Sequence, residues 1–513
     1  MNKESLIKKI SENCHIIINP SAEELRDKAK KDEKTTEFGS ASFVSKIRNR
    51  SAKKTFIVPE TELGIKQPPI EEKEAEELAE KVLEYLKGKE LIQLDKTMCT
   101  NPDYEIPCRL YTTKDFARLG FMWNYMLFPG KGKNPELISV HIPEWPETKI
   151  FCYPKQKITF CLGSDYFGEV KKSFLRMTML YHKEKTKGLG FHAGSKLLKV
   201  KDKTGKIKEV GFIMFGLSGT GKTTLTIHDH GLIGEEKVSI RQDDIVLMDE
   251  KGFCAGTEFG FFIKTEGLDE SQKVLFEAAI KPSAIFENVK VDENGKIDFK
   301  DFELTSNGRG VLPRNEVSGA GKEIDLKKAD KIIFITRRED IVPVIAKLSP
   351  EQAAAFFMLG ESIETSAGDP TKAGQSKREV GTNPFIIGRE EYEGNRLLEI
   401  LKKNPEIECF LMNTGGVGRT GFEKGKNISI KLSTDLMKFV AKDCIEWKKA
   451  EDFNYLVPKT VNGKDFSEFE PSHYYSEEEF REKIDAMKKE RKAWLAQFPK
   501  LKKEISESIY KKV

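Results

Sequence analysis

The sequence lacks several features that would assign it to a special class of protein. No run of about 18 apolar residues occurs, so we expect no segment to span a membrane. None of the eight cysteines lies in a C-x-x-C pair, which argues against a zinc ribbon or a redox dithiol. The net charge of +4 is too small for a chain of 513 residues to indicate a nucleic-acid partner.

The composition is that of a soluble globular protein. Hydrophobic residues make up 38% of the chain and charged residues 33%, and the length exceeds what one hydrophobic core usually holds, so we expect two or three domains. The residues after Met1 carry mixed charges and no apolar stretch, so we expect no signal peptide. We therefore expect a cytoplasmic protein with reduced, mostly buried cysteines.

Hydrophobic periodicity predicts an α/β fold with mixed sheets. Helical spacing is found over residues 71–88 and 476–497, the second beginning after Ser476 as N-cap. Short apolar runs predict strands at 150–153, 158–162, 210–215, 238–248, 331–335 and 409–412. The polar segment 201–209 is typical of a hairpin tip, and we place a domain boundary near residue 205.

The strongest motif is a phosphate-binding loop. An apolar strand ends at Gly216, and the pattern G-x-x-x-x-G-K-T follows before a helix begins near Lys222. Glycines let successive backbone N–H groups point at phosphate oxygens, Lys222 reaches the β- and γ-phosphates, and the Thr223 hydroxyl coordinates Mg²⁺. The predicted nucleotide contacts here are Gly216, Leu217, Ser218, Gly219, Thr220, Gly221, Lys222, Thr223 and Thr224.

Two adjacent acids interrupt the apolar run 238–248. Asp243 and Asp244 lie where P-loop enzymes carry a carboxylate that holds metal, and a buried carboxylate needs such a partner. Neighbouring strand residues face opposite sides, so the two aspartates need different roles unless the strand ends there. Glu235 and Glu236 are rival acids, but their context after Gly234 is typical of a turn.

Two further motifs have simpler interpretations. His228 and His230 have no third ligand at a suitable spacing, so we expect ordinary surface histidines. The glycine-rich run 415–421 lacks the Gly-Lys-Ser/Thr ending of a phosphate loop, and we expect a flexible loop over the nucleotide.

Several segments together resemble the ATP-dependent phosphoenolpyruvate carboxykinase family. The loop F-G-L-S-G-T-G-K-T-T is similar to the family's phosphate loop, and five other segments follow in the family's order between about residues 40 and 435. These are 50–58 (RSAKKTFIV), 162–172 (LGSDYFGEVKK), 191–193 (FHA), 305–313 (TSNGRGVLP) and 411–431 (LMNTGG…GKNISIK). The segment 257–264 departs from the family pattern, as do Leu312 and Asn427, which replace a tyrosine and an arginine.

The resemblance implies a reaction and residue roles. The family converts oxaloacetate and ATP reversibly to phosphoenolpyruvate, CO₂ and ADP, a step of gluconeogenesis or anaplerosis. The implied substrate-binding residues are Arg50, Tyr166 (or Phe167 in its place), Lys172 and Arg309, with Lys172, Arg309 and Lys222 catalytic. The implied ligands of Mn²⁺ are Lys172, His192 and Asp244. Thr223 and Asp243 are the other predicted metal ligands. The residues implied to bind the nucleotide near its adenine are Asn427, Ile428 and Ser433.

The expected organisation is an N-terminal substrate-side domain over 1–205, packed on a P-loop nucleotide- and metal-binding domain over 206–513. The active site would lie in the cleft between them. The partners would be small molecules (oxaloacetate or phosphoenolpyruvate, ATP or ADP, CO₂) and neither nucleic acid nor membrane. Two alternatives are another P-loop small-molecule or protein kinase, and a non-catalytic ATP-binding regulator. The sequence leaves oligomeric state, flux direction and metal preference open.

Overall fold

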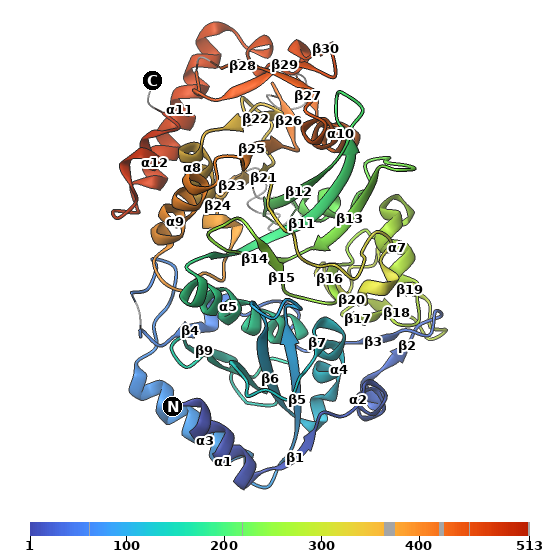
Figure 1. Cartoon of the computed structure of the whole chain (residues 1–513). Coiled ribbons are helices and arrows are strands. Elements are labelled where there is room, and N and C mark those ends of the chain that lie inside the picture. The colour runs from blue at the N-terminus through green and yellow to red at the C-terminus, as the bar shows by residue number, and fades with distance from the viewer. Residues whose placement is uncertain (61, 218, 364–374, 420–424, 451, 511–513) are drawn as a thin grey trace. The chain divides into compact units, whose positions relative to one another are not determined.

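The computed structural model describes residues 1–60, 62–217, 219–363, 375–419, 425–450 and 452–510 (Figure 1). The chain divides into two compact units. Unit 1 consists of Met1–Lys185, Ala255–Ile324 and Phe385–Arg389, and unit 2 of Thr186–Cys254, Asp325–Pro384 and Glu390–Val513. Neither unit is continuous in sequence, and the turn at Gly205 lies inside unit 2.

The larger sheet of unit 1 is mixed. Its order is β1-β5-β6-β8-β10-β9-β4, and the short β7 (Phe128–Pro129) also pairs with β5. The strands are β1 (His15–Ile18), β5 (Glu90–Met98), β6 (Ile106–Thr113), β8 (Leu137–Ile142), β10 (Ile158–Leu162), β9 (Lys149–Tyr153) and β4 (Thr55–Ile57). Helices α1 (Lys3–Asn13) and α3 (Glu72–Leu86) cover one face, because their apolar stripes share a core cluster with the strands.

A second, smaller sheet explains why residues 255–324 belong to unit 1. Its order is β16-β20-β17-β3-β2, and β17 runs parallel to β3. The strands are β16 (Phe261–Lys264), β20 (Arg309–Leu312), β17 (Ile285–Glu287), β3 (Ala41–Phe43) and β2 (Lys34–Thr35), with the hairpin β18 (Lys290–Val291) and β19 (Ile297–Asp298) nearby in sequence. The other helices of this unit are α2 (Ala22–Ala29), α4 (Ala117–Met126), α5 (Phe167–Thr186) and α7 (Lys273–Ala279).

Unit 2 is built on a mixed sheet whose path includes β14-β11-β12-β21-β25-β22-β29-β28, with β13 also paired to β11. The strands are β11 (Leu189–Lys201), β12 (Ile207–Gly216), β13 (Lys237–Gln242), β14 (Ile245–Met248), β21 (Lys331–Thr336), β25 (Glu408–Asn413), β22 (Ile345–Leu348), β29 (Leu456–Val461) and β28 (Ile445–Lys449). The short strands of unit 2 are β23 (Glu361–Ile363), β24 (Ser376–Arg378), β26 (Gly416–Val417), β27 (Lys426–Asn427) and β30 (Lys464–Asp465), and β15 (Cys254–Gly256) begins at the last residue of unit 2 before the chain enters unit 1.

Helices pack on both faces of this sheet. Phe212 and Met214 of β12 share a core cluster with α10 (Ile430–Ala441), whereas Phe215 packs edge-on against Phe357 of α8 with ring centroids 5.9 Å apart. Successive strand residues face opposite sides, so β12 is buried between two helical layers. The remaining helices are α6 (Lys222–Ile227), α8 (Pro350–Leu359), α9 (Glu390–Lys403), α11 (Glu477–Leu495) and α12 (Lys503–Glu507).

Most local predictions are confirmed. Helices α3 and α11 lie where expected, Ser476 caps α11, and 201–209 holds the tip of the β11–β12 hairpin. The predicted single strand 238–248 is wrong, because it is broken into β13 and β14 at Asp243 and Asp244. Six of the eight cysteines are buried. No helix among the described residues is both long and apolar enough to span a bilayer.

A buried ion cluster ties α11 to β23 and β24 in unit 2. Glu361 is fully buried and accepts two hydrogen bonds from Arg491, at 3.0 and 2.6 Å, and a third contact comes from Arg378 at 2.9 Å. These cations hold the pKa of Glu361 well below its usual range, against the opposing effect of burial.

We predict that Glu361→Ala lowers stability by about 3–5 kcal/mol, because it leaves two buried guanidinium groups without their shared carboxylate. Thermal and urea unfolding measure the effect. The control is Glu477→Ala, which breaks an exposed ion pair with Arg481 on α11, the helix that also carries Arg491. It should change the free energy of unfolding little. Equal shifts for both variants would contradict the argument.

Candidate active site

The predicted phosphate loop lies between a strand and a helix of unit 2. Strand β12 ends at Gly216 and helix α6 begins at Lys222. Gly219 and Gly221 adopt φ of +83° and +96°, a left-handed conformation that other residues rarely adopt. A Cβ at Gly216 would lie 2.5 Å from the Thr220 hydroxyl, so this position also requires glycine.

Neighbouring segments hold the loop in place. The Thr414 hydroxyl donates to the Thr220 carbonyl at 2.7 Å, and the Arg337 guanidinium donates to the Gly219 carbonyl at 3.1 Å. Among the other predicted contacts, Leu217 is buried, Thr223 is exposed and Thr224 is half-buried. Ser218 lies outside the described residues.

The break between β13 and β14 brings Asp244 to His192. β11 pairs with both strands, with Gln242 opposite Ser195 and Ile245 opposite His192, so the two aspartates sit at the interruption. Asp244 Oδ1 lies 2.8 Å from His192 Nε2, and the Lys222 Nζ lies 3.4 Å from His192 Nε2 and 3.7 Å from Asp244 Oδ1. Three predicted site residues, His192, Lys222 and Asp244, therefore form one group in unit 2.

A backbone carbonyl fixes the orientation of the His192 ring on the side away from Asp244. Its Nδ1 lies 2.6 Å from the Thr382 carbonyl oxygen, and a carbonyl can only accept, so Nδ1 carries the proton. In the neutral ring, Nε2 then presents a lone pair towards Asp244. Two acceptors 2.8 Å apart require a proton or a cation between them, so these two atoms could hold a metal ion.

Close packing of β11 under the phosphate loop depends on one glycine. A Cβ at Gly194 would lie 2.2 Å from the Thr226 hydroxyl on α6. The missing side chain therefore lets α6, and the Lys222 that begins it, lie directly against the strand that carries His192.

The predicted adenine-side residues lie in a hairpin and helix of unit 2. Asn427 pairs with Gly416 in the β26–β27 hairpin, and the Ile428 N–H donates to the Gly415 carbonyl at 2.9 Å. Ser433 is buried in the first turn of α10 and donates to the Ser429 carbonyl. Of the glycine-rich run, residues 415–419 pack on 338–340, and 420–421 lie outside the described residues.

The prediction that His230 is a surface residue is wrong. His230 is buried behind α6, with Nδ1 2.8 Å from the Thr434 carbonyl and Nε2 against the Lys196 amine. Burial holds the pKa of His230 well below its usual range, so the ring is neutral. The rival acids are engaged elsewhere, Glu235 with Lys201 and Glu236 with Lys442.

In unit 1, Arg50 and Lys172 meet at one aromatic ring. The Arg50 Cζ lies 4.6 Å from the centroid of Phe385, the Lys172 Nζ 4.8 Å and the Arg176 Cζ 5.9 Å. Glu169, one turn before Lys172 on α5, is buried beside all three cations, and burial raises its pKa despite them. The ring and one carboxylate thus gather a cluster of positive charge suited to an anionic substrate.

Tyr166 and Arg309 form a second group in unit 1, joined by Asn307. The Arg309 guanidinium donates to the Asn307 side-chain oxygen at 2.6 Å, and the Asn307 amide donates to the Tyr166 hydroxyl at 3.1 Å. The Arg309 Nε is buried without a hydrogen-bond partner among the described residues. Phe167 instead packs its ring on Phe262, so of the two candidates only Tyr166 has its polar end beside Arg309.

Sequence reasoning missed the residues that support these side chains. Phe385 is a single aromatic residue with no periodic or motif signal, and only folding brings it to Arg50. The Thr382 carbonyl acts through the backbone, so its residue type carries no signal. Asn307 stood within a quoted motif, and its amide could have been assigned from the preference of arginine for planar acceptors.

Comparison with known proteins places this geometry in a family. The model of the family described as phosphoenolpyruvate carboxykinase matches residues 14–467. A protein of Aeropyrum pernix named phosphoenolpyruvate carboxykinase (ATP) is 34% identical over 389 residues, covering 75% of this chain and 77% of its own. The chain belongs to the phosphoenolpyruvate carboxykinase family.

More distant carboxykinases extend the match along the chain. A protein of the same name from Christiangramia forsetii is 26% identical over 486 residues, covering 88% of this chain and 87% of its own. One from Alkaliphilus oremlandii is 28% identical over 440 residues, covering 80% and 79%. The predicted family and enzyme class are confirmed, while the roles of individual site residues stay predictions.

We predict that Lys222→Ala weakens ATP binding about 10- to 100-fold, because a lost charge-assisted contact to phosphate is worth about 1.5–3 kcal/mol. Titration calorimetry with ATP and Mg²⁺ measures the dissociation constant. Lys203→Ala, at an exposed lysine of the β11–β12 turn, is the matched control and should bind like wild type. Undiminished affinity in Lys222→Ala would refute the phosphate-loop assignment.

Proposed function

We propose that this protein catalyses the reversible reaction of oxaloacetate and ATP to phosphoenolpyruvate, CO₂ and ADP. The observation that carries the proposal is the family match over residues 14–467, within which the segments of both site groups fall. The arrangement of the site residues within each unit also supports the proposal. In a cell this reaction would serve gluconeogenesis or anaplerosis, and the mostly buried cysteines fit a cytoplasmic enzyme.

The cations of unit 1 suit a dianionic substrate. Guanidinium groups bind carboxylates in a planar, two-bonded geometry, and we assign Arg50 to the oxaloacetate carboxylate. Lys172 lies at the same Phe385 ring, so both side chains can act on one small molecule. Arg309 is assigned to the charge that develops during phosphoryl transfer, and its buried, unpartnered Nε supports a ligand contact there.

Divalent cations fit the donors that the chain supplies. Among the described residues no group of three or more His, Cys, Asp and Glu side chains forms a metal site, so the proposed sets draw on other donors. Lys172, His192 and Asp244 would hold Mn²⁺, and Thr223 with Asp243 would hold Mg²⁺. Such ions would supply Lewis acidity towards the enolate and phosphate oxygens.

The protein's own groups perform the remaining work. Lys222 neutralises the transferred phosphate, and the glycine backbone of 216–221 offers N–H donors to it. Lys172 would have to be neutral to offer a lone pair to a metal. We propose ATP rather than GTP for two reasons. The loop is similar to that of the ATP-dependent enzymes, and the relative from Aeropyrum pernix is named as an ATP enzyme.

We predict that Arg309→Lys keeps ATP binding and loses about 100- to 1000-fold in kcat, because lysine cannot reproduce the planar contact to the transferred group. Coupled assays of ADP formation, run with oxaloacetate and with either ATP or GTP, measure it. Arg481→Lys, at an exposed arginine, is the control. Wild-type kcat in Arg309→Lys would refute the role, and ADP formation independent of oxaloacetate would indicate a different kinase.

We further predict that Asp244→Asn weakens Mn²⁺ binding about 10-fold or more, because one anionic oxygen leaves the set beside His192. Electron paramagnetic resonance of free Mn²⁺ reports binding without turnover. Glu209→Gln, an exposed acid of β12, should leave the binding isotherm unchanged. Identical isotherms for Asp244→Asn and wild type would exclude Asp244 as a ligand.

A further inference from the structure

Two carboxylates hold the segment that carries Arg50. The Asp165 side chain accepts hydrogen bonds from two successive backbone N–H groups, those of Lys46 at 2.9 Å and Ile47 at 3.0 Å. At the other end, the Glu169 carboxylate accepts from the Ser51 N–H. Asp165 lies two residues before α5 and Glu169 lies in its first turn, so the start of this helix anchors both ends of the segment 46–51.

Behind Asp165 lies a buried guanidinium. Arg118, at the start of α4, donates to Asp165 Oδ2 at 2.8 Å and to Glu287 Oε1 at 3.3 Å. Only 3% of the Arg118 side chain is exposed, 8% of Asp165 and none of Glu287. Arg118 therefore keeps two buried carboxylates together that would otherwise repel each other.

Glu287 extends the chain of contacts to the other substrate group. It accepts a hydrogen bond from the Phe167 N–H at 2.8 Å, which caps α5 next to Tyr166. On the sheet, Glu287 of β17 lies directly opposite Arg309 of β20. The two carboxylates bound to Arg118 thus reach backbone or strand positions beside Arg50, Tyr166 and Arg309.

We propose that Arg118 and Glu287 are positioning residues for the substrate: they hold Asp165 and the start of α5 so that Arg50, Tyr166 and Arg309 keep their orientation. This inference rests on the proposed function. Neither side chain is among the residues assigned to substrate, nucleotide or metal, so a change in either acts through backbone and side-chain placement.

The pair also makes substrate affinity sensitive to pH. Complete burial raises the pKa of Glu287 to about 7 despite Arg118, and the negative charge of Asp165 acts in the same direction as burial. The groups that face Glu287 are Arg118 from α4, Asp165 and Tyr166 before α5, and Arg309 from β20. The charged Arg118–Glu287 pair is therefore complete above about pH 7 and is lost as the pH falls below that value.

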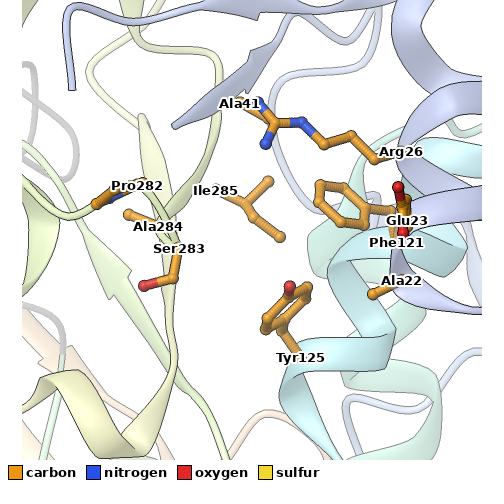
Figure 2. A pocket seen from close by; sticks show the side chains of 10 residues that line it. All are labelled: Ala22, Glu23, Arg26, Ala41, Phe121, Tyr125, Pro282, Ser283, Ala284 and Ile285. Carbon is orange, nitrogen blue, oxygen red and sulfur yellow. The ribbon is translucent and has the colours of Figure 1, made fainter. Parts of the chain in front are cut away.

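Helix α4 and strand β17, which carry Arg118 and Glu287, also contain a residue suited to a matched control. Figure 2 shows the later part of α4 and the start of β17, where Phe121, Tyr125 and Ile285 line a cavity of about 320 Å³. None of the positioning contacts described above involves Tyr125, and the Tyr125 hydroxyl makes no hydrogen bond among the described residues. Tyr125→Phe therefore changes α4 without touching Arg118 or its partners.

The test is steady-state kinetics of the full chain with Arg118→Met, Arg118→Lys, Glu287→Gln and Tyr125→Phe. We expect Arg118→Met to raise the KM for oxaloacetate about 10- to 100-fold, because small displacements of substrate-binding groups cost this much. The KM for ATP should change less than about twofold, because no assigned nucleotide contact is displaced. Arg118→Lys should recover part of the loss, since it keeps the charge but not both hydrogen bonds. Tyr125→Phe should match wild type.

The pH profile separates positioning from simple support of the fold. Wild type should show a rise in the KM for oxaloacetate as the pH falls from 8 to 6, and this rise should be smaller in Glu287→Gln, which does not titrate. If Arg118→Met does not fold, Arg118→Lys and Glu287→Gln decide the question.

The outcomes separate the two claims. A wild-type protein without oxaloacetate-dependent turnover overturns the proposed function. An active wild type whose Arg118 and Glu287 variants keep the KM for oxaloacetate, or change both KM values equally, overturns the positioning role alone.

Discussion

Burial of charge is the constraint that both units obey. A charged side chain removed from water costs several kcal/mol unless an opposite charge and hydrogen bonds replace the water. In unit 1, Lys171 meets Glu258, 87 positions away, with both side chains 1% exposed. In unit 2, Arg491 meets Glu361, 130 positions away. Each buried charge needs an opposite charge from a remote part of the chain, so these pairs specify which distant segments come together. Apolar packing alone is less specific.

Local elements of the fold followed from the sequence, and their assembly did not. Helices α3 and α11 carry apolar stripes and terminal signals within their own residues, so periodicity was sufficient. The membership of residues 255–324 in unit 1 depends on the parallel pairing of β17 with β3, more than 240 positions apart by their register of Ile285 with Ala41. No local pattern encodes such a pairing, so a division near residue 205 was the natural expectation from sequence.

The same distinction applies to the site. The predicted phosphate loop is a contiguous motif that the sequence shows directly, and Gly219 and Gly221 within it adopt left-handed conformations. Asp243 and Asp244 were noticed because acids are unusual in an apolar strand, and the break in the strand removes the need for them to face opposite sides. His230 was misjudged because its burial depends on Lys196 and Thr434, which reach it from a strand and a helix elsewhere in unit 2. Phe385 could not be found because its partners, Arg50 and Lys172, are brought to it only by tertiary folding.

The way the chain alternates between the units has a consequence for its synthesis. The chain leaves one unit for the other after Lys185, Cys254, Ile324, Pro384 and Arg389. Unit 1 lacks its final five residues until translation has passed residue 389, and those residues include the ring at which Arg50 and Lys172 meet. Unit 1 therefore cannot be completed before residues 186–254 and 325–384 of unit 2 have been synthesised. A continuous gene fragment that encodes all of one unit must therefore also encode part of the other.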